Sequence, residues 1–222
     1  MKTTAIIVAA GSGSRLDPET PKQFLILDGK PVLAHTLERF QSAPSIDSIV
    51  LVLAANRVSE FEQKFDKVIK ILAGGPTRAA SVLNGLNAVD SGSAIVAVHD
   101  GARPFVSVDE IERTVASAKE TGAACLVGSV TDTIKTIRGD EISGTLDRDK
   151  LRRALTPQVF RSELLRRAFE LGGTGEAVTD ECYLVEKLGH PIAFVEGSSR
   201  NIKITNPEDL VLAEAIAVGG RR

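Results

Sequence analysis

The sequence predicts an α/β protein built on a doubly wound, mainly parallel sheet, and three observations lead to that class. Short apolar runs rich in β-branched residues recur along the chain, and segments with helical periodicity lie between them. The length of 222 residues is ordinary for one such domain. A chain of this size can bury a full hydrophobic core without disulfides or a structural metal, so we expect residues 1–222 to form a single domain.

Strands are expected where apolar residues run continuously rather than alternately. Four such runs occupy residues 4–10, 48–54, 68–73 and 94–99. Runs that are apolar on both faces are typical of parallel strands covered by helices on both sides. Residues 123–128 and 192–196 are further strand candidates.

Helices are expected between these strands, where apolar residues return every three or four positions. The two clearest faces consist of Leu33, Leu37 and Phe40, and of Val108, Ile111, Val115 and Ala118. A last helix is predicted to open at residues 206–209, with Asn as N-cap, Pro at the first helical position and two acids after it.

Residues 132–148 interrupt this alternation and predict an inserted β-hairpin. Alternating Thr and Ile residues flank a turn-like segment at 138–141. An isolated hairpin is marginal in water, and this one has too few apolar residues to form its own core. It must therefore pack on another surface, and a second subunit is the natural candidate, which makes 132–148 a predicted dimerisation arm.

Charge and composition exclude several classes of function. The formal net charge is −2, so the chain has no global field that would attract nucleic acid or an anionic membrane. Its longest apolar run, residues 49–55, is too short to cross a bilayer. The only cysteines are Cys125 and Cys182, which favours a reducing compartment over a disulfide framework. We therefore expect a cytoplasmic protein with neither nucleic-acid nor membrane partners, in which local Lys and Arg residues bind any phosphate.

The strongest functional signal is the glycine-rich segment after the first strand. Residues 11–15 read Gly-Ser-Gly-Ser-Arg, and Lys22 follows shortly after. Small residues let backbone N–H groups approach a polyphosphate closely. A dinucleotide fingerprint would place a third glycine where Leu16 stands, and the Gly-Lys-Ser/Thr of a Walker loop is absent. A plain strand-to-helix turn would explain the glycines but not the two cations, so phosphate binding is predicted here.

Two later segments also follow predicted strands. Gly74 and Gly75 open a helix, where backbone could approach a planar base and the Ser81 hydroxyl would be available; a tight turn with a surface Arg78 is the simpler alternative. Asp100 ends another strand, where ligands of open α/β sheets bind, and it could hold Mg²⁺. A capping role for this aspartate explains the pattern equally well.

Three weaker signals lie further along the chain. Lys203 stands in a short strand-like segment between isoleucines, where it could also extend to solvent. Thr179 is a good N-cap for a helix beginning at Asp180-Glu181. Arg148 belongs to a basic patch that is more typical of a solvated surface, and His99 is expected to be packed or hydrogen-bonded rather than catalytic.

Taken together, these motifs occur in the order found in one family. They are Ala-Ala-Gly-Ser-Gly-Ser-Arg with Pro-Lys-Gln-Phe, Gly-Gly…Arg…Ser-Val, His-Asp-Gly-Ala-Arg-Pro, Leu-Thr-Pro-Gln, Thr-Asp-Glu and Asn-Ile-Lys. The chain thus resembles the 2-C-methyl-D-erythritol 4-phosphate (MEP) cytidylyltransferases over residues 9–212. The resemblance implies a Rossmann-like fold of the nucleotidyltransferase type, a homodimer, Mg²⁺ or another divalent cation as cofactor, and CTP and a small sugar-alcohol phosphate as substrates.

The resemblance also implies roles for individual residues. Those implied in catalysis are Arg15, Lys22 and Lys203. Those implied in binding CTP are Ala9, Ala10, Gly11, Ser12, Gly13, Gly75, Pro76, Ser81 and Asp100, the last also as the metal ligand. Those implied in binding the acceptor are Arg103, Thr133, Arg148, Thr156 and Thr179, with Thr133 and Arg148 donated by the neighbouring subunit.

Two departures and two alternatives accompany this interpretation. Pro76 has no N–H, so it can read a base only through its carbonyl, and Arg200 stands where relatives often carry an acid. Ribitol-5-phosphate cytidylyltransferase, which shares most of the CTP-side motifs, is the alternative enzyme. A pyrophosphorylase-like binding module that has lost catalysis is the alternative class. Retention of the charged residues Arg15, Lys22, Asp100 and Lys203 argues against it.

Overall fold

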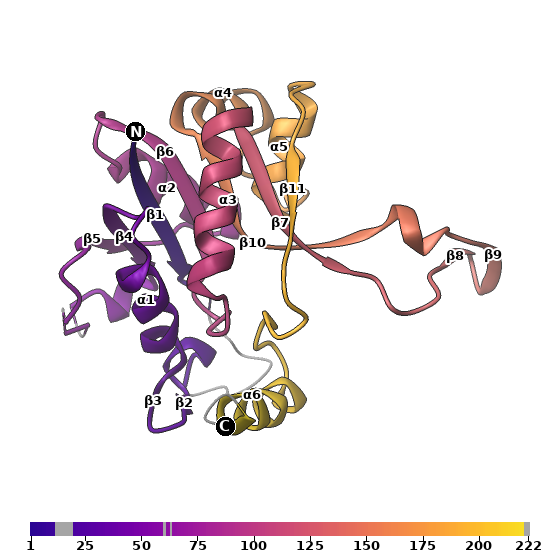
Figure 1. The fold of residues 1–222 in the computed structure, drawn as a ribbon, viewed down its shortest axis with the longest axis horizontal. Helices are drawn as coiled ribbons and strands as arrows, with labels where there is room; N and C mark the ends of the chain where they lie inside the picture. Colours follow the sequence, from indigo (N-terminus) through magenta and orange to yellow (C-terminus); the bar gives the residue numbers. More distant parts are fainter. Residues whose placement is uncertain (12–19, 60, 63, 220–222) are drawn as a thin grey trace.

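The predicted doubly wound α/β class is confirmed by a seven-stranded sheet with helices on both faces (Figure 1). A computed structural model describes residues 1–11, 20–59, 61–62 and 64–219. The strand order is β11-β7-β10-β6-β1-β4-β5, and every neighbouring pair except the two that involve β10 is parallel. Within these described ranges, no helix is long and apolar enough to cross a membrane.

The central strands are buried on both faces, as their continuous apolar character predicts. They are β1 (Lys2–Ala9), β4 (Ser48–Leu53), β6 (Ser93–Asp100) and β7 (Ala123–Ser129). Strand β5 (Val68–Ala73) was also expected to be covered on both faces, but it lies at the edge of the sheet. Only Val68 of this strand is buried, and Ile69 is exposed, so an apolar run did not distinguish an edge strand from a central one.

Strand β10 (Arg152–Arg161) was not predicted. It lies antiparallel between β6 and β7, close to the middle of the sheet. Pro157 within the run argues against a central strand, because proline cannot donate to the ladder. In the structure Pro157 lies where the pairing of β10 with β7 is interrupted, between Ala154 and Gln158, and the Thr156–Pro157 peptide is cis. Strand β11 (Ala193–Glu196) completes the sheet beside β7.

The helices form two layers that bury separate apolar clusters against the sheet. Helices α1 (Val32–Ser42) and α3 (Val108–Thr121) cover one face. The periodic residues predicted for them lie in the core of this face, except Val108, which is partly buried and packs against it. Helices α2 (Arg78–Ala88), α4 (Ser162–Gly172) and α5 (Glu181–Lys187) cover the other face. Helix α6 (Pro207–Gly219), which begins as predicted, packs beside the small β2–β3 pair (Ile26–Leu27 and Lys30–Pro31).

The predicted hairpin is confirmed as strands β8 (Lys135–Arg138) and β9 (Glu141–Thr145). Gly139 makes the turn at a φ of 59°, a left-handed conformation that glycine adopts without strain. The hairpin projects away from the body of the molecule on two extended segments (Figure 1). Its apolar side chains meet solvent, since Ile137 is 73% and Ile142 is 69% exposed. The arm therefore has no core of its own.

Candidate functional site

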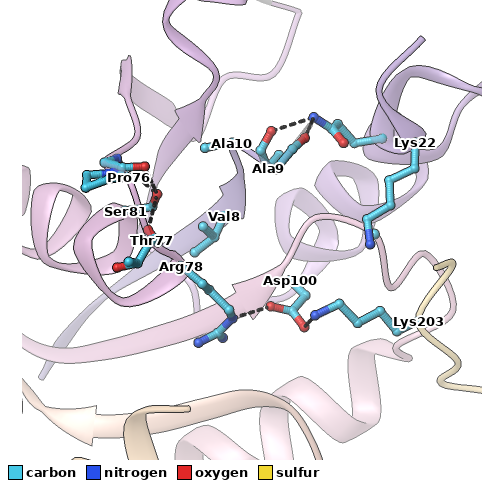
Figure 2. A pocket seen from close by; sticks show the side chains of 14 residues that line it. Val8, Ala9, Ala10, Lys22, Pro76, Thr77, Arg78, Ser81, Asp100 and Lys203 are labelled. Carbon is cyan, nitrogen blue, oxygen red and sulfur yellow. Dashed lines mark hydrogen bonds and ion pairs between the residues drawn. The ribbon is translucent and has the colours of Figure 1, made fainter. Parts of the chain in front are cut away.

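A cavity of about 530 Å³ opens where β1 and β6 end and α2 begins (Figure 2). This is the edge at which ligands of open α/β sheets bind. Its walls bring together nine of the residues predicted to act on the nucleotide: Ala9, Ala10, Gly11, Lys22, Gly75, Pro76, Ser81, Asp100 and Lys203. Val8, Gln23, Thr77, Arg78 and Ala102 complete the lining. Segments from the two ends of the chain thus meet around one hollow.

The end of β1 is held in place by a buried glutamine. Gln23 donates from Nε2 to the carbonyl of Ala9 at 2.7 Å and to that of Gly11 at 3.1 Å. It belongs to the 3₁₀ turn η1 (Lys22–Phe24), so the same contact places Lys22 beside the strand end. The predicted residues Ser12, Gly13 and Arg15 lie outside the described residues.

The turn between β5 and α2 is shaped by Ser81. Its Oγ accepts a hydrogen bond from the Gly75 N–H at 3.1 Å and donates to the Thr77 carbonyl at 2.9 Å. The hydroxyl was expected to be available to a base, but it is buried and engaged in the turn. A side chain at Gly74 would collide with Ala10 and lie 2.7 Å from Ser81 Oγ, which explains the small residue there.

Asp100 lies at the centre of a cluster of cations. Its Oδ1 pairs with Arg78 Nε at 2.9 Å, and its Oδ2 pairs with Lys203 Nζ at 2.8 Å and with Arg103 Nε at 3.5 Å. Burial opposes ionisation, but the three cations hold the pKa of this carboxyl well below its usual range.

The expectation that Asp100 holds Mg²⁺ does not fit this arrangement. A carboxylate that already has three cationic partners is poorly suited to binding a further cation, because both of its oxygens are engaged. Among the described residues, no three His, Cys, Asp or Glu side chains gather into a metal-binding group. The described residues therefore do not form a metal site of the protein's own.

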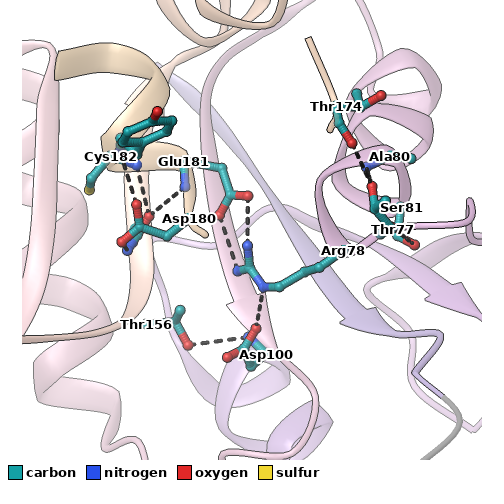
Figure 3. A network of polar contacts seen from close by, with 12 residues as sticks. Thr77, Arg78, Ala80, Ser81, Asp100, Thr156, Thr174, Asp180, Glu181 and Cys182 are labelled. Atoms are coloured by element: carbon teal, nitrogen blue, oxygen red, sulfur yellow. Dashed lines mark hydrogen bonds and ion pairs between the residues drawn. The ribbon is translucent and has the colours of Figure 1, made fainter. Parts of the chain in front are cut away.

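The simpler alternative for the turn after β5, in which Arg78 is a surface residue, is wrong. Arg78 lies in the cavity wall and pairs with Glu181, which is fully buried, through NH1–Oε1 at 2.8 Å and NH2–Oε2 at 3.1 Å (Figure 3). Burial acts against the charge, but Glu181 and Asp100 raise the pKa of Arg78 above its usual value; burial also raises the pKa of Glu181. A signal was present: a cation at the first position of a helix is disfavoured by the dipole, so it calls for carboxylate partners.

A directed chain of hydrogen bonds connects Asp100 to His99. The Asp100 N–H donates to Thr156 Oγ1 at 3.2 Å, and Thr156 Oγ1 lies 3.0 Å from His99 Nδ1. His99 Nε2 lies 3.2 Å from the Arg103 carbonyl, which can only accept, so the proton of a neutral ring must be on Nε2. The Thr156 hydroxyl therefore donates to Nδ1, and its proton is not available to an acceptor substrate.

His99 gives this site a testable dependence on pH. Burial lowers the pKa of His99 from 6.5 to about 3. Between these two pH values His99 binds a proton in the unfolded chain but not in the folded chain. Its effect on the free energy of unfolding is therefore absent above pH 6.5, and it lowers this free energy increasingly as the pH drops toward 3.

We expect the His99→Gln variant to lose this part of the pH dependence. As the pH drops from about 6 to 4, the free energy of unfolding of the variant should fall less steeply than that of the wild type. The difference between the two slopes should be up to about 1.4 kcal/mol per pH unit. Urea denaturation of both proteins across this range measures the slopes. Equal slopes would show that His99 is not held neutral in the folded protein.

The remaining acceptor residues lie at different distances from the cavity. Arg103 and Thr156 contact Asp100 directly. Thr179 is exposed and does not line the cavity, and the N-cap predicted for it belongs instead to Asp180, whose Oδ1 accepts from the Tyr183 N–H at 2.9 Å. Aspartate at position 180 is equally good at capping, so the sequence alone did not separate the two residues.

The predicted acceptor residues of the arm are not brought to the cavity of their own chain. Arg148 begins the 3₁₀ turn η3 (Arg148–Lys150), is exposed, and donates from NH1 to the Thr131 carbonyl at 2.9 Å. Thr133 is exposed where the arm leaves the sheet. Neither residue lines the cavity.

Gln158 was missed because its segment was not recognised as a strand. It is buried in β10, donates to Asp180 Oδ2 at 2.9 Å and accepts from the N–H groups of Glu181 and Cys182. The start of α5 is therefore tied to the middle of the sheet. This contact fixes the position from which Glu181 reaches Arg78.

Comparison with known proteins identifies the family to which this site belongs. Residues 3–218 match the profile described as IspD: 2-C-methyl-D-erythritol 4-phosphate cytidylyltransferase. A protein of that name from Geotalea uraniireducens is 41% identical, over 97% of this chain and 96% of its own. Crystal structures of 4-diphosphocytidyl-2C-methyl-D-erythritol synthase from Anaerococcus prevotii and of the cytidylyltransferase from Thermus thermophilus superpose with TM-scores of 0.86 and 0.80. They are 32% and 35% identical, and each comparison covers 98% of this chain, with 98% and 100% of the respective structures. The chain that forms this cavity belongs to the 2-C-methyl-D-erythritol 4-phosphate cytidylyltransferase family.

Proposed function

We propose that this protein transfers CMP from CTP to 2-C-methyl-D-erythritol 4-phosphate, giving 4-diphosphocytidyl-2-C-methyl-D-erythritol and pyrophosphate. The observation that carries the proposal is the cavity itself, in which Lys22 from the N-terminal half and Lys203 from the C-terminal half line one hollow (Figure 2). Family membership supplies the identity of the two substrates.

The chemistry asks for positioning and positive charge rather than for a base. A phosphate oxygen of the acceptor is already an anion when it attacks the α-phosphorus of CTP, and pyrophosphate leaves on the opposite side. Lys22 and Lys203, with Arg15, neutralise the charge that develops on the α-phosphoryl oxygens. His99 is buried and neutral, so it supports the strand end rather than moving a proton.

A divalent cation is proposed to enter with the nucleotide. Mg²⁺ is commonly held by substrate phosphates and water with few protein ligands, which is compatible with the lack of a carboxylate group suited to it among the described residues. The protein is proposed to act in the cytoplasm. Its two cysteines, Cys125 and Cys182, are free and buried, which is compatible with a reducing compartment.

Assays with two acceptors and four nucleotides test this proposal. MEP is expected to accept CMP and ribitol 5-phosphate is not, since the family match and the named relatives are MEP cytidylyltransferases. CTP should be preferred over UTP, ATP and GTP by about 100-fold or more in kcat/KM, because the family is one of cytidylyltransferases and backbone groups at Gly75 and Pro76 in the cavity wall can distinguish an amino edge from a keto edge. Comparable turnover with ATP or GTP, or faster transfer to ribitol 5-phosphate, would contradict the assignment.

The arm is proposed to complete the acceptor site of a second subunit in a two-fold dimer. Two observations support this: its exposed Ile137 and Ile142 need a covering surface, and its Arg148 does not line the cavity of its own chain. A two-fold dimer uses the same patch twice, so both arms would be covered and both sites completed. Arg148 is suited to clamping the acceptor phosphate through its planar fork.

A further inference from the structure

Arg78 and Glu181 join the starts of two helices that are far apart in the sequence. Arg78 is the first residue of α2 and Glu181 the first residue of α5. All three nitrogens of the guanidinium are engaged, two by Glu181 and the third, Nε, by Asp100 (Figure 3). The side chain therefore has a fixed orientation, and its charge is already matched by carboxylates.

The network runs from the core to the cavity in order of increasing exposure. The side chain of Glu181 is 0% exposed, that of Asp100 is 9%, that of Arg78 is 25% and that of Lys203 is 36%. Lys203 is thus the most accessible member and the one best placed to meet an incoming anion. Glu181, Asp100 and Arg78 lie deeper in the protein, and Lys203 extends from them into the cavity.

Lys203 has to leave Asp100, at least in part, if it is to bind a phosphate oxygen. Removing the only partner of a buried carboxylate is costly, because its charge is left unpaired. Asp100 would retain Arg78 on Oδ1, with Arg103 at 3.5 Å from Oδ2. The carboxylate therefore remains compensated when Lys203 moves.

We propose that Arg78, oriented by Glu181, is a positioning residue that holds Asp100 through Oδ1 and so lets Lys203 exchange Asp100 Oδ2 for a phosphate oxygen of the nucleotide. This proposal rests on the proposed function, because the phosphate is that of CTP. Without Arg78, Asp100 has one cation fewer and attracts Lys203 more strongly. The nucleotide would then lose the contribution of Lys203, although no contact between Arg78 and the nucleotide is involved.

The test is a cycle of variants read by the affinity for CTP in isothermal titration calorimetry. Arg78→Met/Glu181→Gln removes both charges together, so that neither is left buried without its partner. We expect its dissociation constant for CTP to rise about tenfold, as for the loss of one charge-assisted hydrogen bond. Adding Asp100→Asn should release Lys203 and return the constant to within about threefold of the wild-type value.

A matched control is available on the surface. Arg113→Met/Asp109→Asn makes equivalent changes at an exposed ion pair of α3, and should leave the affinity within about twofold of wild type. If Arg78→Met/Glu181→Gln proves unfolded by circular dichroism, Arg78→Lys with and without Asp100→Asn gives the same comparison. Lysine keeps the charge but cannot contact Glu181 and Asp100 at once.

Recovery on adding Asp100→Asn is the decisive result. If Arg78 touched the nucleotide itself, or only stabilised the fold, the loss of affinity would persist or grow in the triple variant, and the proposal would be wrong. Failure of the proposed function is visible separately, as absence of CMP transfer to MEP by the wild-type protein. The binding cycle does not depend on that transfer.

Discussion

Replacing Lys22 by alanine is expected to lower turnover about 10²–10³-fold, the usual loss when one electrostatic stabiliser of a transition state is removed. Lys22 lines the cavity from the 3₁₀ turn η1, and Lys203 lines the same cavity. Its charge acts most strongly where negative charge develops, on the α-phosphoryl group. Steady-state assays with CTP and MEP measure the effect, and Arg15→Ala is expected to behave similarly.

A matched substitution distinguishes the effect of removing a lysine from the cavity from the effect of removing a lysine elsewhere. Lys70→Ala changes a half-exposed lysine on the edge strand β5, where it pairs with Asp90 at 3.8 Å, and should leave turnover within about twofold. Thermal unfolding of Lys22→Ala should resemble that of the wild type, because the side chain is only half-buried. A folded Lys22→Ala protein with near-normal turnover would remove Lys22 from the mechanism.

Mixing two inactive or impaired variants is expected to restore activity, if the arm of one subunit completes the site of the other. Arg148→Ala should raise the KM for MEP and leave that for CTP nearly unchanged, because Arg148 is proposed to contact only the acceptor. In a heterodimer of Arg148→Ala with Lys22→Ala, one of the two sites has both residues intact. At MEP concentrations below the raised KM of Arg148→Ala, activity above that of either variant alone is therefore expected after subunit exchange.

Sedimentation and an exchange control make this result interpretable. Analytical ultracentrifugation establishes the dimer, and mass-labelled subunits establish that exchange has occurred. Arg113→Ala, a surface change on α3, should give no change in KM for either substrate. An active monomer, or no recovery despite demonstrated exchange, would contradict a shared site.

Local patterns predicted most of the sheet and both helix faces that bury the large apolar side chains. Continuous apolar runs identify β1, β4 and β6 because strands covered on both sides carry no alternation. The same pattern could not tell that β5 is an edge strand, since order within a sheet depends on contacts distant in the sequence. Strand β10 was missed because Pro157 is a local argument against a strand, which the fold overrides.

The residues of the candidate site also fall into those that local motifs predict and those that depend on contacts distant in the sequence. Residues recognised through the family motifs, such as Lys22 and Lys203, do line the cavity. The orientation of the Thr156 hydroxyl, by contrast, depends on His99, which lies 57 positions away in the sequence. A surface position for Arg78 remained the simpler alternative because its partner Glu181 lies 103 positions away.

The attachment of the arm has a consequence for how such proteins can diverge. The arm leaves the sheet after β7 and returns in β10, and these strands are adjacent, with Arg152 opposite Ser129. Its two ends are therefore clamped together by the core, and the closure entropy of the loop between them changes only slowly with length. Insertions, deletions and exchanges within the arm thus cost the core little. If the arm completes the acceptor site as proposed, changes within it can alter acceptor preference while the nucleotide-binding framework stays under separate constraint.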